Sequence, residues 1–290
     1  MRPVSTMVRV GTHHVAVHDW GGDGDPILLA HATGFHGLVW RPVAERLVAA
    51  GHRVWSFDFR GHGDSDRSPD GYAWERFGDD AAGVLATLDV GTDGRLLTVG
   101  HSKGATALLL AEGGHPGIVR RAWCYEPVVI PGEPRDADPD FPLAVGARRR
   151  RATWDTPEEA YRSWAARPPF ADLHPDALAA YVEYGLRPRS DGAWELKCAP
   201  EDEAATYAHG PSHGLWPALP TIHTTVRVVC GERSDAVPPR LAERIAARLP
   251  NGSVEVMAGV GHFGPLEDPD AASASILAFD DLTRVGSGLR

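Results

Sequence analysis

Cysteine is scarce in this chain, and its three residues, Cys124, Cys198 and Cys230, are widely separated. That number and spacing exclude a disulfide framework and do not match the ligand spacing of a zinc site. Cys124 and Cys230 lie within apolar runs that are typical of buried strands, where cysteine packs as a small hydrophobic side chain. We therefore expect a protein of a reducing compartment, the cytoplasm, with no metal site.

The sequence also lacks a long apolar run and an excess of basic residues. No stretch approaches the roughly 20 apolar residues that cross a bilayer, and the N-terminus has no signal-peptide pattern. The formal net charge is -10, and the only basic block, Arg148 to Arg151, is typical of a solvated helix face. Because nucleic acids and anionic membranes bind clustered basic residues, the sequence predicts neither as a partner.

Short apolar runs alternate with segments of helical periodicity along most of the 290 residues. This pattern is typical of a mostly parallel sheet covered by helices on both faces, an α/β fold. The predicted strands span 14–18, 26–31, 53–58, 95–100, 121–125, 226–231 and 253–257. The predicted helices span 42–50, 74–88, 102–112, 239–249 and 270–279.

The alternation stops between residues 129 and 221. Amphipathic helical patterns at 157–166 and 175–184 are followed there by a strand-like stretch at 193–198. A helical insertion between two core strands is the simplest account. The sequence thus predicts a core formed by residues 1–130 and 222–290, with a helical cap at residues 131–221.

The predicted strand at 95–100 runs directly into the motif GHSKG, which contains Ser102, and then into a helix. A nucleophile held on such a sharp turn needs glycine on both sides, because neighbouring backbone leaves no room for a Cβ. The helix that follows directs N–H groups toward an anion formed on the attacked carbonyl. Ser102 is therefore the candidate nucleophile.

Two further loops follow strands of the predicted sheet. After the strand at 26–31 the chain reads HATGFHG, and a loop in that place can supply a backbone N–H to an oxyanion hole. We assign that N–H to Thr33, with the N–H of Lys103 as the second donor. After the last strand the chain reads GVGHFGP, and this glycine-lined loop makes His262 the candidate general base.

The chain resembles the α/β-hydrolase superfamily over nearly its whole length. The resemblance rests on the stretch DFRGHGDSD at 58–66, the elbow GHSKG, the ending GVGHFGPLEDP and the chain order of serine, acid and histidine. It implies an eight-stranded, mostly parallel core with a helical cap inserted after the sixth strand. These motifs do not identify a substrate.

The acid of the implied Ser-His-acid triad has two candidates. Most relatives carry it after the seventh strand as G-x-x-D-x-x-V-P, but an ungapped count puts Ser234 at that place here and Asp235 one residue later. Glu126 follows the sixth strand, where some branches, including haloalkane dehalogenases, carry their acid. Either carboxylate can hold His262 in the required tautomer and stabilise its cation. The count favours Glu126.

The side chain of Lys103 also departs from the superfamily, since relatives more often carry an uncharged residue after the nucleophile. If its ammonium points into the pocket, it can bind a substrate carboxylate or stabilise an oxyanion. If it points away, it can pair with an acid such as Glu126. The sequence favours the second arrangement.

The motifs together predict a serine hydrolase that cleaves an ester, thioester, lactone or related carbonyl compound through an acyl-enzyme on Ser102, without metal or organic cofactor. Aromatic residues of the cap favour a medium-sized, largely apolar small molecule as the substrate. Two other classes stay open. One is a non-hydrolytic enzyme of the same fold, such as a cofactor-independent lyase, haloperoxidase or cyclase. The other is a non-catalytic ligand-binding protein, against which the intact motifs argue.

Overall fold

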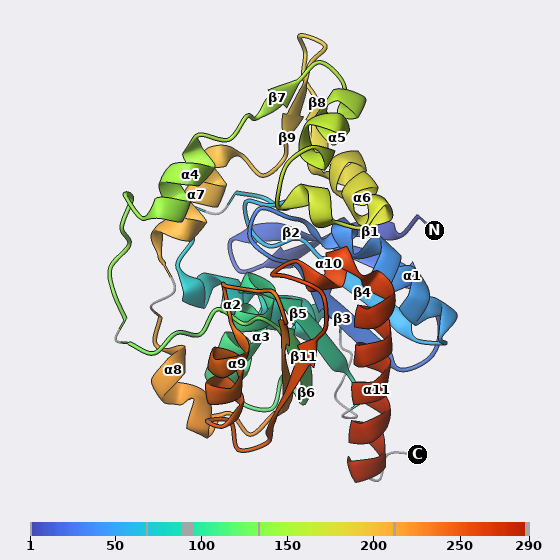
Figure 1. Cartoon of the computed structure of the whole chain (residues 1–290), viewed down its shortest axis with the longest axis vertical. Coiled ribbons are helices and arrows are strands. Elements are labelled where there is room, and N and C mark those ends of the chain that lie inside the picture. The colour runs from blue at the N-terminus through green and yellow to red at the C-terminus, as the bar shows by residue number, and fades with distance from the viewer. Residues whose placement is uncertain (1, 68, 89–94, 133, 211–212, 288–290) are drawn as a thin grey trace.

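The computed structural model describes residues 2–67, 69–88, 95–132, 134–210 and 213–287 (Figure 1). Within them one sheet has the strand order β1-β2-β4-β3-β5-β6-β10-β11. Its strands are β1 (Val4–Val10), β2 (His13–Gly21), β3 (Pro26–Ala30), β4 (Arg53–Phe57), β5 (Leu97–His101), β6 (Arg121–Tyr125), β10 (Thr225–Gly231) and β11 (Gly252–Met257). β1 pairs antiparallel with β2 and β2 with β4, whereas the pairings from β4 to β11 are parallel. The predicted α/β fold with a mostly parallel eight-stranded sheet is confirmed.

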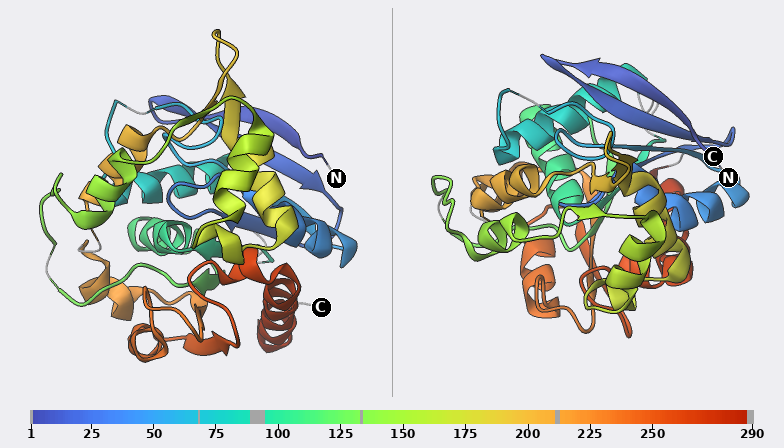
Figure 2. Two further views of the ribbon diagram at one scale, coloured as in Figure 1. Left: turned by 45° about the horizontal axis from the view of Figure 1, so that its top comes forward. Right: turned by 90° about the horizontal axis from the view of Figure 1, so that it is seen from above.

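Helices cover both faces of this sheet, as the turned views in Figure 2 also show. One face carries α2 (Trp74–Leu88), α3 (Lys103–Gly114) and α9 (Pro239–Ala246), and the other carries α1 (Arg41–Ala49) and α11 (Pro269–Ser287). The short elements η1 (Gly37–Trp40) and α10 (Gly264–Glu267) precede α1 and α11. Strand side chains alternate between the faces, so that Leu28 packs in one core cluster and Ile27 and Leu29 in the other.

Strand β1 is a core strand that the sequence analysis missed. It pairs at the edge of the sheet with β2, and of its seven residues Val10 alone is buried. A strand with its side chains exposed on both faces produces no apolar run in the sequence.

Helix α11 continues past the predicted end at residue 279, because Asp280 pairs with Arg121 through a buried contact of 2.7 Å. In the part of the chain that is described, no helix is both long and apolar enough to cross a bilayer.

The segment between β6 and β10 has its own secondary structure. It contains α4 (Pro142–Arg148), β7 (Thr153–Trp154), α5 (Pro157–Ala165), η2 (Phe170–Asp172), α6 (Pro175–Gly185), β8 (Leu186–Pro188), β9 (Trp194–Leu196), α7 (Pro200–Ala208), α8 (Leu215–Ala218) and η3 (Leu219–Thr221). Strands β7, β9 and β8 form a small antiparallel sheet. This sheet and α4 to α7 lie together at the top of Figure 1, whereas Leu215 of α8 packs in the core cluster beside α3. The division into core and cap at residues 131 and 221 stays a prediction.

Candidate active site

Ser102 sits on a strained turn between β5 and α3. Its backbone has φ 53° and ψ -116°, a left-handed conformation that costs a non-glycine residue free energy. The turn is held because the Ser102 N–H donates a 2.8 Å hydrogen bond to the carbonyl of Tyr125 on β6. A Cβ at Gly100 would overlap the backbone of Ala105, and one at Gly104 would overlap the carbonyl that ends β3. The glycine requirement of the motif therefore has a direct steric cause.

Glu126 contacts the imidazole of His262. Its Oε2 lies 2.6 Å from His262 Nδ1, and the carboxylate also accepts hydrogen bonds from the Gly231 N–H (2.9 Å) and the Ser234 hydroxyl (2.7 Å). Glu126 is fully buried, so these three contacts replace the water that a carboxylate would otherwise bind. Ser234, the residue in the usual place of the acid, is thus a hydrogen-bond donor to the carboxylate.

Asp235 has a different position. It is exposed and lines the pocket, and no hydrogen bond or ion pair joins it to His262. Of the two candidate acids, the structure therefore brings Glu126 and not Asp235 against the imidazole.

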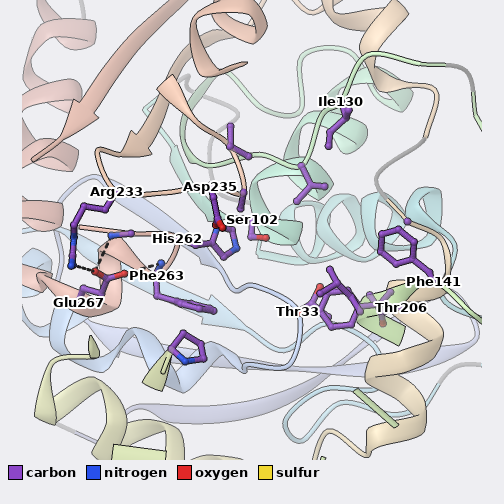
Figure 3. A pocket seen from close by; sticks show the side chains of 18 of the residues that line it. Thr33, Ser102, Ile130, Phe141, Thr206, Arg233, Asp235, His262, Phe263 and Glu267 are labelled. Carbon is purple, nitrogen blue, oxygen red and sulfur yellow. Dashed lines mark hydrogen bonds and ion pairs between the residues drawn. The ribbon is translucent and has the colours of Figure 1, made fainter. Parts of the chain in front are cut away.

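Ser102 and His262 line the same pocket, and Figure 3 shows the imidazole directed toward the serine. No direct hydrogen bond joins the serine hydroxyl to the ring. Such bonds often tighten only when the substrate binds, so this geometry suits a nucleophile and its base.

The loop that carries His262 is held by residues that the sequence analysis did not single out. The ring of His101 contacts the His262 carbonyl at 2.8 Å, and the hydroxyl of Tyr125 donates to the Gly261 carbonyl at 2.5 Å. Burial lowers the pKa of His101, so its ring is neutral and serves as an N–H donor. Glu267 accepts from the N–H groups of Gly261 and Phe263. Two of these residues were within reach of sequence reasoning, because His101 lies inside the elbow motif and Tyr125 directly precedes Glu126.

Thr33 lies on the loop after β3 and lines the pocket opposite the nucleophile (Figure 3). Among the described residues its N–H has no hydrogen-bond partner, and Gly34 beside it has φ +78°. His31 fixes this loop in place. Its Nδ1 contacts the Ala32 carbonyl at 2.7 Å, and its Nε2 accepts a hydrogen bond from the Phe59 N–H at 3.0 Å. Lys103 begins α3, and the first N–H groups of a helix have no partner inside it. Two backbone donors are therefore available near Ser102.

The ammonium group of Lys103 points away from this pocket. It is fully buried, 4.5 Å from the ring centroid of Phe59, 4.6 Å from that of Phe77 and 3.3 Å from Nε2 of His62. No carboxylate of the described residues pairs with it, and Glu126 bonds elsewhere, so the expected pair with Glu126 does not form. Burial lowers the pKa of Lys103 to about 7. Burial and the nearby Lys103 also lower the pKa of His62.

The pocket has a volume of about 620 Å³ and is lined mainly by apolar side chains. They come from both the sheet side and the segment between β6 and β10, and include Trp74, Val128, Ile130, Phe141, Leu143 and Val237. No group of three or more side chains suited to a metal occurs within the described ranges. The cavity thus offers a largely apolar, partly open space in front of Ser102.

Similar proteins share this architecture. A 2-(acetamidomethylene)succinate hydrolase of Mesorhizobium japonicum is 28% identical over 279 residues, which cover 96% of this chain and 95% of that protein. A non-heme haloperoxidase of Rhodococcus erythropolis is 25% identical, with 90% and 93% covered. The crystal structure of an E-2-(acetamidomethylene)succinate hydrolase aligns with a TM-score of 0.79 at 26% identity, covering 97% of this chain and all of that chain. A family model described as "Alpha/beta hydrolase family" matches residues 27–275, and this chain therefore belongs to the alpha/beta hydrolase family.

Proposed function

We propose that this protein is a serine hydrolase that cleaves an ester, thioester, lactone or related carbonyl compound through an acyl-enzyme on Ser102. One observation carries the proposal: a serine on a strained turn and an imidazole that contacts a buried carboxylate line the same pocket. Ser102 follows β5 in a left-handed conformation, and His262 is held by Glu126 at 2.6 Å. This combination of residue types in these roles is the apparatus of nucleophilic acyl transfer.

The reaction would begin when Ser102 Oγ attacks the substrate carbonyl carbon and His262 Nε2 takes the hydroxyl proton. The negative charge that forms on the carbonyl oxygen is stabilised by the N–H groups of Thr33 and Lys103. Glu126 accepts the Nδ1–H of His262 and stabilises the imidazolium. The leaving group departs with the proton from His262, and water activated by the same imidazole then releases the acid and restores Ser102.

The names of the relatives support hydrolysis, and they also suggest a second candidate function. One relative that matches along nearly its whole length is named a hydrolase, whereas another is named a haloperoxidase, and a single fold can carry different reactions. The second candidate is therefore a non-hydrolytic reaction at the same serine. It requires that the pocket keep out the water that would release an acyl-enzyme.

The pocket also bears on the substrate. A cavity of about 620 Å³ with mainly apolar walls fits a medium-sized, largely apolar acyl group. Phe141 and Tyr207 of the predicted cap contribute to these walls. We therefore propose that residues 131–221 cover the nucleophile and select the substrate by shape.

Covalent labelling with a fluorophosphonate tests the proposal. We expect the wild-type protein to be labelled on Ser102 and the Ser102→Ala variant to be unlabelled and inactive, with an unchanged melting temperature. Ser190→Ala, which alters an exposed serine outside the pocket, is the matched control and should label normally. Labelling of the Ser102→Ala variant at the wild-type level would show that the nucleophile is wrong. Two sets of assays separate hydrolysis from the non-hydrolytic reaction. One measures hydrolysis of a panel of esters, thioesters, lactones and diketones, and the other measures halide oxidation by peroxide.

A further inference from the structure

A second cavity, which we name the arginine cavity, adjoins the pocket of Ser102. It has a volume of about 490 Å³. Thr33, Pro169, Tyr207 and Phe263 line both spaces, so the two cavities meet beside the oxyanion loop. A substrate with its carbonyl at Ser102 can therefore extend into the arginine cavity.

Four arginines lie in the wall of this cavity: Arg149, Arg150, Arg151 and Arg167. The sequence favoured a solvated helix face for the block at 148–151. Most of this block is exposed, as expected, but its last three members follow the end of α4 and line the cavity. The fourth arginine follows α5, from a separate part of the chain. This convergence could not be read from the basic run alone.

The four guanidinium groups differ in how they are paired. Arg150 forms an ion pair with Glu203 and donates to the Tyr181 hydroxyl at 2.8 Å, and Arg151 pairs with Glu159 at 2.7 Å. Arg149 and Arg167 have no side-chain hydrogen bond or ion pair with any residue in the described ranges. Two cations are therefore free to bind an anion that enters the cavity.

The two cavities carry charge of opposite sign. Among the described residues, Glu203 is the one carboxylate that lines the arginine cavity, and Arg150 already neutralises it. The pocket of Ser102 is lined by three carboxylates, Asp172, Asp235 and Glu267, and by one arginine, Arg233, which pairs with Glu267. An anionic group is attracted to one end and repelled from the other, which orients a substrate before any reaction.

We propose that the arginine cavity binds a carboxylate or phosphate group at the far end of the substrate's acyl chain. Guanidinium groups bind both anions through paired N–H donors, and aromatic walls offer apolar contact to the chain that leads to the anion. Those walls include Phe35, Trp154, Trp164 and Phe170. The inference rests on the proposed function for its substrate, but not for the binding of the anion itself.

Matched esters test the inference. Monomethyl glutarate and methyl pentanoate differ only at the end of the acyl chain, and methyl 4-phosphonobutanoate carries the phosphorus anion in the same place. Acid release in a pH-stat gives kcat and KM for each. We expect the wild-type kcat/KM to be at least roughly tenfold higher for an anionic ester than for methyl pentanoate. The preferred anion shows whether the source is a carboxylate or a phosphate.

Substitutions assign this preference to the arginines. Arg149→Gln and Arg167→Gln should each lower kcat/KM for the preferred anionic ester roughly three- to tenfold, mainly through KM, and leave methyl pentanoate unchanged. Arg162→Gln on α5 alters an exposed arginine that does not line the cavity and is the control. Equal rates for neutral and anionic esters in the wild type, or equal losses on both in the variants, would overturn the inference.

Binding without catalysis separates the two proposals. Calorimetric titration of Ser102→Ala with monomethyl glutarate and with inorganic phosphate measures the site directly. The same titration is repeated with a variant that combines Ser102→Ala with Arg149→Gln and Arg167→Gln. Weaker binding to this variant supports the anion site even if no ester is hydrolysed. If esters are hydrolysed but neither anion binds, the proposed function stands and the anion site is wrong.

Discussion

Replacing Lys103 by methionine should stabilise the protein at neutral and acidic pH. The ammonium is fully buried between Phe59, Phe77 and His62, and no carboxylate in the described ranges pairs with it. Its pKa of about 7, lowered from 10.5, corresponds to about 5 kcal/mol at 1.4 kcal/mol for each tenfold change in proton affinity. The two aromatic rings offset about 1–2 kcal/mol of this penalty. We therefore expect Lys103→Met to raise the free energy of unfolding by about 3–4 kcal/mol at pH 6, because methionine fills the same space without a charge.

The gain should depend on pH in a defined direction. Because the folded-state pKa of Lys103 is lowered, the unfolded chain binds more protons between pH 7 and pH 10.5, and wild-type stability rises with pH across that window. Below about pH 7 the lysine is charged in both states and the full penalty is present. The advantage of Lys103→Met should thus shrink to about 1.4 kcal/mol at pH 9.5, which is one pH unit below the pKa of the unfolded lysine.

Urea unfolding followed by tryptophan fluorescence at pH 6 and pH 9.5 measures both values. Lys197→Met is the matched control, since Lys197 pairs with Asp64 at 2.6 Å. That variant should lose a little stability at both pH values. A Lys103→Met variant that is less stable than wild type at pH 6, or whose gain is the same at pH 9.5, would refute the reasoning.

Two further predictions concern the carboxylates and the elbow. Glu126→Gln should lower kcat by about 10⁴-fold, as loss of the orienting acid does in serine proteases, while Asp235→Asn should cost less than tenfold. Steady-state kinetics decide this, and the reverse order of effects would exchange the two roles. Gly104→Ala should destabilise the fold by about 1–3 kcal/mol because its Cβ overlaps the carbonyl that ends β3. Gly113→Ala in the same helix meets nothing within 4 Å and should stabilise by about 0.5–1 kcal/mol. Equal melting temperatures for these two variants would contradict the steric argument.

Features that depend on neighbouring residues were predictable from the sequence. The strand, turn and helix around Ser102 are encoded within about fifteen residues, since the glycines and the apolar runs are all local. The same holds for β3 and β10, whose apolar runs are bounded by glycine or proline. The same holds for Glu126, which the ungapped count favoured, because that count depends only on which residues directly follow each strand in the sequence.

Features built from remote segments were not predictable in this way. The site of the Lys103 ammonium is formed by Phe59, His62 and Phe77, which precede it by more than twenty residues. The convergence of Arg167 with the block at 149–151 depends on the fold of α5 against α6. Periodicity reports which residues are apolar, but it does not report which distant segment packs against them.

The origin of the carboxylate that contacts His262 affects how the site can diversify. Because Glu126 follows β6, β10 and the loop after it supply hydrogen bonds to this carboxylate, from the Gly231 N–H at the end of β10 and from the Ser234 hydroxyl in the loop. The next residues, Asp235 to Val237, line the pocket without contacting the imidazole. In the proposed mechanism, the carboxylate that orients the base and the pocket residues 235–237 thus follow different strands, β6 and β10. We therefore expect mutations at 235–237 to change substrate preference, during evolution or in a directed library, while the imidazole keeps its alignment.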